Sequence, residues 1–174
     1  MNTLADPKWL ADAKSFVGMK EIVGAKHNQT IVNFMKDLSG GSIKDDETAW
    51  CAGFTGFILK RAGLKLPDSP LSARAYLSLP NEIDRPAVGA IAVFWRGSKA
   101  GWQGHIGFIA GRDMKNNIMV VSGNNNNMVN IAPYQWQGPG HRLLGFRWPS
   151  IAPRPERYHL PIVAATSSGG GSEA

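Results

Sequence analysis

Cys51 is the only cysteine among the 174 residues, and it follows an acidic, cap-rich stretch at 45–50. The apolar residues after it recur with helical spacing, which predicts that Cys51 lies at the N-terminus of a helix. Unpaired backbone N–H groups at such an end stabilise a thiolate and lower the pKa of the thiol. A thiolate is a nucleophile, so this placement predicts covalent catalysis. The alternative is a free cysteine that fills the core as a small apolar side chain.

A nucleophilic cysteine needs a base, and the sequence has four histidines. His105 begins an apolar stretch, with nearby glycines that let other backbone or a substrate approach closely. The other three, His27, His141 and His159, lie in a polar loop, a Gly-Pro-Gly turn and the last stretch of the chain. Histidines in such places usually belong to the surface or to turns. We therefore predict that His105 is the base.

A catalytic histidine also needs an acceptor that orients its other ring nitrogen. A polar run at 122–127, Ser-Gly-Asn-Asn-Asn-Asn, follows an apolar stretch and offers side-chain carbonyl groups. The alternative is an ordinary polar turn, because asparagine tolerates left-handed backbone conformations. The run by itself does not decide between the two.

Four helices are expected in the first half of the chain, and the third carries Cys51. Their expected ranges are about 7–18, 31–38, 49–62 and 72–79. In the third helix, Asp46, Glu47 or Thr48 can accept hydrogen bonds from the first-turn amides. Gly63 can end it in the left-handed conformation. Because Cys51 is one position out of step with the apolar stripe, it is expected to point about 100° away from that stripe, towards a cleft.

Five short apolar runs follow Pro86, and the Gly, Asn and Pro clusters between them predict antiparallel strands joined by turns. These runs lie at 90–95, 106–110, 118–121, 128–131 and 143–148. Helices followed by strands predict an α+β fold, with N-terminal helices packed on a C-terminal antiparallel sheet of about five strands. We expect one domain over residues 1–150. The Pro-, Gly- and Ser-rich residues 151–174 lack periodicity and are expected to form a flexible tail.

Composition and charge exclude several classes of protein. One cysteine allows no intramolecular disulfide framework and no multi-cysteine zinc site, and we predict neither a metal nor a cofactor. The net charge of +6 suits an anionic partner, but no nucleic-acid-binding motif accompanies it. No run is long and apolar enough to span a bilayer. The start of the chain lacks the features of a secretory signal, so we expect synthesis in the cytoplasm and export by another route.

Four motifs taken together point to a family. They are Trp-Cys-Ala-Gly-Phe at 50–54, Gly-Ala-Ile-Ala-Val-Phe at 89–94, Trp-Gln-Gly-His-Ile-Gly at 102–107 and Ser-Gly-Asn-Asn at 122–125. In this order they resemble the CHAP amidohydrolase/peptidase group of NlpC-like, papain-like peptidoglycan hydrolases. The resemblance covers about Pro7 to Pro149 and is greatest to single-domain members of phage type.

This resemblance implies a papain-like fold in which Cys51 is the nucleophile, His105 the base and Asn124 the polar third member. Many relatives carry a glutamate two residues before that asparagine, whereas this chain has Ser122 there. The acidic residues 45–47 do not clearly reproduce the loop that calcium-binding members use. The residues expected to contact the substrate are Trp102, Trp50, Gln103 and Asn125.

The implied function is a peptidoglycan hydrolase, an endopeptidase or an N-acetylmuramoyl-L-alanine amidase, that cleaves an amide bond through a thioester. We expect a monomeric phage or prophage endolysin that acts on the wall after release, with bacterial peptidoglycan as its partner and no nucleic acid. One alternative is an antibacterial effector amidase, delivered by a secretion system and paired with an immunity protein. Another is a non-catalytic wall-binding module on the same fold, although binding alone needs no thiol beside a histidine.

Overall fold

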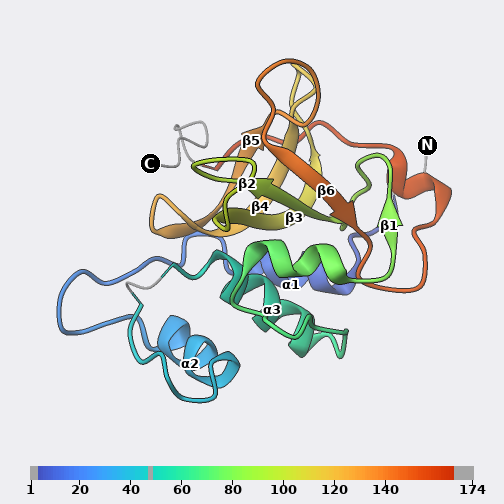
Figure 1. Ribbon diagram of the computed structural model, residues 1–174. Helices are drawn as coiled ribbons and strands as arrows, with labels where there is room; N and C mark the ends of the chain where they lie inside the picture. Colours follow the sequence, from blue (N-terminus) through green and yellow to red (C-terminus); the bar gives the residue numbers. More distant parts are fainter. Residues whose placement is uncertain (1–3, 47–48, 167–174) are drawn as a thin grey trace.

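The computed structural model describes residues 4–46 and 49–166 (Figure 1). Helices dominate the first half of the chain: α1 (Lys8–Ser15), α2 (Gln29–Leu38), α3 (Cys51–Arg61) and the 3-10 helix η1 (Ala73–Ser78). The second half contributes β1 (Glu82–Ile83), β2 (Ile91–Trp95), β3 (Gly104–Arg112), β4 (Ile118–Asn125), β5 (Met128–Tyr134), β6 (Leu143–Arg147) and the 3-10 helix η2 (Pro155–Tyr158). The predicted α+β class is confirmed, and β1 adds a short edge strand to the five strands that the sequence predicts.

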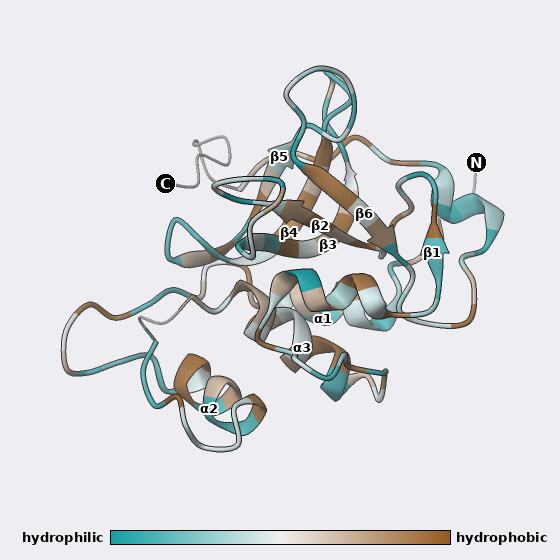
Figure 2. Ribbon diagram, in the orientation of Figure 1, coloured by the Kyte–Doolittle hydropathy of each residue, from teal (hydrophilic) through white to brown (hydrophobic). Residues whose placement is uncertain are grey.

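Within the described residues the strands form one antiparallel sheet in the order β1-β6-β2-β3-β4-β5. Helices α1 and α3 lie against one face of this sheet, and α2 lies farther out (Figure 1). Hydrophobic residues run along the strands (Figure 2). Because successive side chains of a strand point to opposite faces, they supply two cores. Ile91 and Val93 of β2 face the helices, whereas Ala92 and Phe94 face the other side.

The face of the sheet opposite the helices is concave. Phe94 of β2 and Tyr134 of β5 stack with their ring centroids 4.8 Å apart, although β3 and β4 separate their strands. In a flat sheet these strands would lie roughly 14 Å apart, three times the usual strand spacing. The sheet must therefore curl, which brings the end of β5 over the residues of β2 and β3.

Helix α3 approaches the sheet closely at Gly123 of β4. A Cβ atom on this residue would lie 2.7 Å from Cβ of Phe54 and 2.7 Å from the Trp50 ring. Glycine is the residue that permits this approach, and the contact sets the position of the first turn of α3 relative to the end of β4.

The start of α3 differs from the expected arrangement. The N-cap residue is Trp50, and its side chain makes no capping hydrogen bond. Asp46 was expected as a possible cap, but its carboxylate binds the segment around residues 22–28 instead. The other two expected caps, Glu47 and Thr48, lie outside the described residues. At the other end of the helix, Gly63 has a φ of +70°, as predicted.

The tail expected after residue 150 is not loose over residues 155–166. Ile162 forms a parallel bridge with Arg112 at the end of β3. Thr166 bonds to Ile131 of β5 twice, because its N–H donates to the Ile131 carbonyl and its Oγ1 accepts from the Ile131 amide. The expectation of a flexible tail is corrected for these residues. Residues 167–174 of that tail lie outside the described residues.

Candidate active site

Cys51 is the first residue of α3, and its side chain is 6% exposed. The first backbone N–H groups of a helix have no intrahelical partner, so they are available beside this thiol. Tyr76 of η1 packs next to it, and its hydroxyl bonds to the carbonyls of Ala52 and Pro70 at 3.0 and 2.9 Å. Burial, and then the charge of Cys51, raise the pKa of Tyr76 above its ordinary value. Tyr76 therefore stays protonated as a hydrogen-bond donor.

His105 is the second residue of β3 and is almost completely buried. Its cross-strand neighbour on β2 is Phe94, and both residues face the concave side of the sheet. The ring of Tyr134 is nearly parallel to the imidazole, with 13° between the planes and 5.5 Å between the centroids. Two aromatic rings therefore lie beside the candidate base.

The start of α3 and the start of β3 both contact the 3-10 helix η1. Tyr76 bonds to the carbonyl of Ala52 in the first turn of α3. A Cβ atom on Gly104, the residue before His105, would lie 3.3 Å from Ala73 at the start of η1. The thiol and the candidate base are thus carried by two element ends that meet the same short helix.

The polar run at 122–127 divides between two environments. Asn124 is half-buried and has a φ of +55°, the left-handed conformation that the sequence allows for asparagine. Asn125 is 1% exposed, and its Nδ2 donates to Oδ1 of Asn130 and to the hydroxyl of Tyr134, both at 3.0 Å. Ser122 lies opposite Asn130 in the β4–β5 pairing and is fully buried.

Sequence reasoning missed Asn130 and Tyr134 as members of this cluster. Both stand in a strand that was identified by its apolar residues alone. An asparagine within such a run was the available signal, because a buried amide requires hydrogen-bond partners. Two buried oxygens in the cluster, Ser122 Oγ and Asn125 Oδ1, have no hydrogen-bond partner among the described residues.

The four expected substrate contacts also separate into two groups. Trp102 is 82% exposed and Gln103 is exposed, and both stand in the loop before β3. Arg74 holds this loop, because its guanidinium donates to three loop carbonyls at 2.8 Å. Trp50 is fully buried, and its Nε1 donates to the Glu21 carboxylate. Its ring belongs to the core, and Asn125 is likewise buried, so neither offers a surface to substrate here.

Asp46 is a buried carboxylate five residues before Cys51. It accepts hydrogen bonds from the backbone amides of Ile22 and Asn28, and Nδ1 of His27 lies 2.7 Å from its Oδ1. Burial alone would raise the pKa of Asp46, but these amides, together with the bond and charge of His27, hold it below its usual value. Among residues 4–46 and 49–166, no group of three His, Cys, Asp or Glu is arranged to hold a metal ion.

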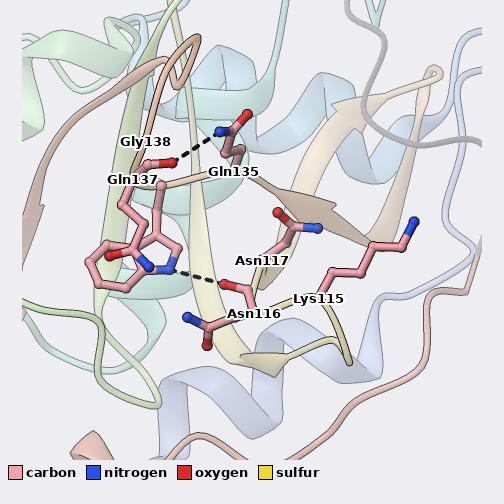
Figure 3. A pocket seen from close by; sticks show the side chains of 7 residues that line it. Lys115, Asn116, Asn117, Gln135, Gln137 and Gly138 are labelled. Atoms are coloured by element: carbon pink, nitrogen blue, oxygen red, sulfur yellow. Dashed lines mark hydrogen bonds between the residues drawn. The ribbon is translucent and has the colours of Figure 1, made fainter.

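A surface pocket lies apart from Cys51 and His105, at the β3–β4 turn and the chain after β5 (Figure 3). Its lining includes Trp136, Gln135 and Lys115, and the indole N–H of Trp136 donates to the Asn116 carbonyl. The residues expected to do chemistry do not line it.

Comparison with known proteins supports the fold. No protein-family model matches the sequence, and no curated protein matches it. The chain is similar to a solved structure described as an NlpC/P60 family protein from Bacillus cereus ATCC 10987, with a TM-score of 0.52 and 20% sequence identity. The similarity covers 85% of this chain and 41% of the other. The fold is therefore similar to that of this NlpC/P60 family protein, and this chain spans less than half of that protein's length. No helix in the described part of the chain is long and apolar enough to cross a membrane.

Proposed function

We propose that this protein is a cysteine hydrolase that cleaves an amide bond of bacterial peptidoglycan. The observation that carries the proposal is the position of Cys51 at the first residue of α3, whose first turn contacts the same 3-10 helix η1 as the start of the strand that bears His105. The papain-like fold and the motif resemblance around both residues support the same reaction. The net charge of +6 favours encounter with an anionic wall.

In the proposed reaction, the Cys51 thiolate attacks the amide carbonyl carbon. The backbone N–H of Cys51 donates to the oxyanion that forms, because it has no partner within the helix. The protonated imidazole of His105 gives its proton to the leaving nitrogen as the carbon–nitrogen bond breaks. Water, deprotonated by His105, then attacks the thioester, and the carbon–sulfur bond breaks to restore the thiolate. Asn124 is proposed to orient the imidazole.

Within this class, we infer a wall-lytic enzyme of phage or prophage origin that acts as a monomer after release from the cytoplasm. Support for this finer assignment comes from the motif resemblance to single-domain endolysins. Trp102 and Gln103 are proposed to contact the wall, because both are exposed in the loop that precedes His105.

The test is digestion of purified peptidoglycan sacculi from several wall chemotypes, followed by mass spectrometry of the fragments. Wild-type protein is expected to release new amino and carboxyl groups, and Cys51→Ala is expected to release none. His159→Ala is the matched control, because this histidine is exposed near the end of the chain. A chelator is expected to leave the activity intact, whereas iodoacetamide removes it. Turnover by Cys51→Ala, or intact sacculi of every chemotype, contradicts the proposal.

A further inference from the structure

We propose that Tyr134 is a positioning residue for His105 and that the amide of Asn125 holds Tyr134 in place. This inference rests on the proposed function, because it concerns the base of the same reaction. Its evidence is a continuous chain of contacts from a buried amide through a phenol to the imidazole.

The first contact is the aromatic stack. The rings of Tyr134 and His105 lie within 13° of parallel at 5.5 Å, and Tyr134 also stacks on Phe94 at 4.8 Å and 29°. An imidazole in a papain-like site must keep its plane aligned with the sulfur, because proton transfer depends on that alignment. A parallel neighbour restricts rotation of the imidazole about the bond that joins it to Cβ. Tyr134 therefore fixes the plane of the ring.

The second contact fixes Tyr134 itself. The primary amide of Asn125 has two N–H donors, and it uses both, one on the Tyr134 hydroxyl and one on Oδ1 of Asn130. Asn130 returns a hydrogen bond from its own Nδ2 to the backbone carbonyl of Asn125. The amide is thus held from two sides, and the phenol oxygen is held by the amide.

The third observation is the backbone that brings Asn125 to this face. The β4–β5 register shifts between Ser122 and Asn125, so the strict alternation of the strand is broken at that point. This irregularity places Asn125 beside Asn130 in a fully buried cluster, whereas the preceding Asn124 stays half-buried in a left-handed conformation. Irregularities of this kind commonly re-aim a side chain next to an active site.

The experiment compares Tyr134→Leu, which removes the ring, with Tyr134→Phe, which keeps the ring and removes the acceptor of Asn125. Tyr158→Leu is the matched control, because this tyrosine is half-buried in η2. For sacculus digestion, Tyr134→Leu is expected to lower kcat by about tenfold or more with KM nearly unchanged, a part of the roughly 10²–10⁴-fold that acid–base transfer supplies. Tyr134→Phe is expected to recover most of that loss. Tyr158→Leu is expected to keep the wild-type kcat.

A second measurement needs no substrate. In NMR spectra of histidine-labelled protein, the His105 ring signals are identified by their absence in His105→Gln. They are expected to move downfield in Tyr134→Leu, because shielding by the stacked ring is lost, and to move little in Tyr134→Phe. Iodoacetamide labelling of Cys51 is expected to slow more in Tyr134→Leu than in Tyr134→Phe.

The outcomes separate the two proposals. If wild-type protein digests no sacculi but the His105 signals respond to Tyr134→Leu, the proposed function fails and the positioning role stands. Unmoved His105 signals together with an unchanged kcat in Tyr134→Leu overturn the positioning role, whatever the activity of the wild type. If Tyr134→Leu does not fold, the comparison of Tyr134→Phe with Asn125→Ala decides. Asn125→Ala loses the bond to Asn130 as well as the bond to the phenol, so His105 signals that stay unmoved in both variants overturn the proposed path through the amide.

Discussion

Replacing Asp46 by alanine tests how the chain before the candidate nucleophile is held. The carboxylate is fully buried and satisfies the backbone amides of Ile22 and Asn28 and the ring of His27. An amide that loses its acceptor costs about 1–3 kcal/mol when water cannot reach it and less when it is part-buried, as these two are, and loss of the contact with His27 adds to this. We expect the free energy of unfolding to fall by about 3–5 kcal/mol, out of roughly 5–15 kcal/mol for an ordinary domain. Asp46→Asn keeps a carbonyl acceptor and is expected to lose less.

The assay is urea unfolding followed by tryptophan fluorescence, for wild type and Asp46→Ala, from pH 7 to pH 3. The pKa of Asp46 is depressed in the folded state, so its contribution is present in full above the unfolded value of about 3.9. This contribution is lost as the pH falls through the folded value, so the gap between the two proteins is expected to narrow towards pH 3. Asp37→Ala is the control, because its ion pair with Lys60 is exposed and contributes little. A gap below about 1 kcal/mol at pH 7, or one that does not change with pH, refutes the reasoning.

Three further predictions concern the segment after Arg154, the contact between Gly123 and α3, and the candidate base His105. Truncation after Arg154 removes a segment that bonds to β3 and β5, so urea unfolding is expected to show a loss of about 2 kcal/mol or more; an unchanged midpoint contradicts this. Gly123→Ala places a Cβ against the Phe54 side chain and is expected to cost about 1–3 kcal/mol and to slow iodoacetamide labelling of the cysteine; wild-type stability and labelling argue against the contact. In sacculus digestion, His105→Ala is expected to fall to background, whereas Asn124→Ala keeps residual activity because it only orients the ring; equal losses contradict that division.

The helix that starts at Cys51 and the strand that carries His105 could be predicted because local patterns define them. Apolar spacing, basic residues in the last turn and Gly63 mark the helix within about a dozen residues. Turn residues on either side mark the strand. Each element needs only its own residues and their immediate neighbours, so sequence reasoning finds both and misses their bounds by only a few positions.

The partners of Asp46 and Asn125 could not be predicted in the same way. Asp46 looks like a helix cap by its position, yet its acceptor oxygens bind groups 18–24 residues earlier in the chain. Asn125 reaches Tyr134 because the sheet curls and β4 is irregular near its end. Neither the curl of the sheet nor the irregularity of β4 produces a periodic pattern of residues in the sequence.

The segment after Pro155 was misjudged for a related reason. It is bound mainly through its backbone, by a bridge at Ile162 and hydrogen bonds at Thr166, and contributes few apolar side chains, such as Leu160 and Val163. A single extended segment of this kind needs no alternation of apolar and polar residues, because neither of its faces is fully covered by the rest of the protein. Absence of periodicity therefore excludes an amphipathic element but not a docked one.

The two candidate catalytic groups depend on different cores, and β3 is the element that joins them. Ile106 packs in the same core as Cys51 on the helix side, whereas its neighbour His105 faces Phe94 and Tyr134 on the concave side. A slip of one residue in β3 would exchange these faces and move the imidazole into the helix-side core. Packing on both faces of β3 resists that slip, since it would place the imidazole among the apolar side chains of the helix-side core and force both cores to repack. Packing changes in either core are thus expected to reach the site through the register of β3, even where the altered residue touches neither group.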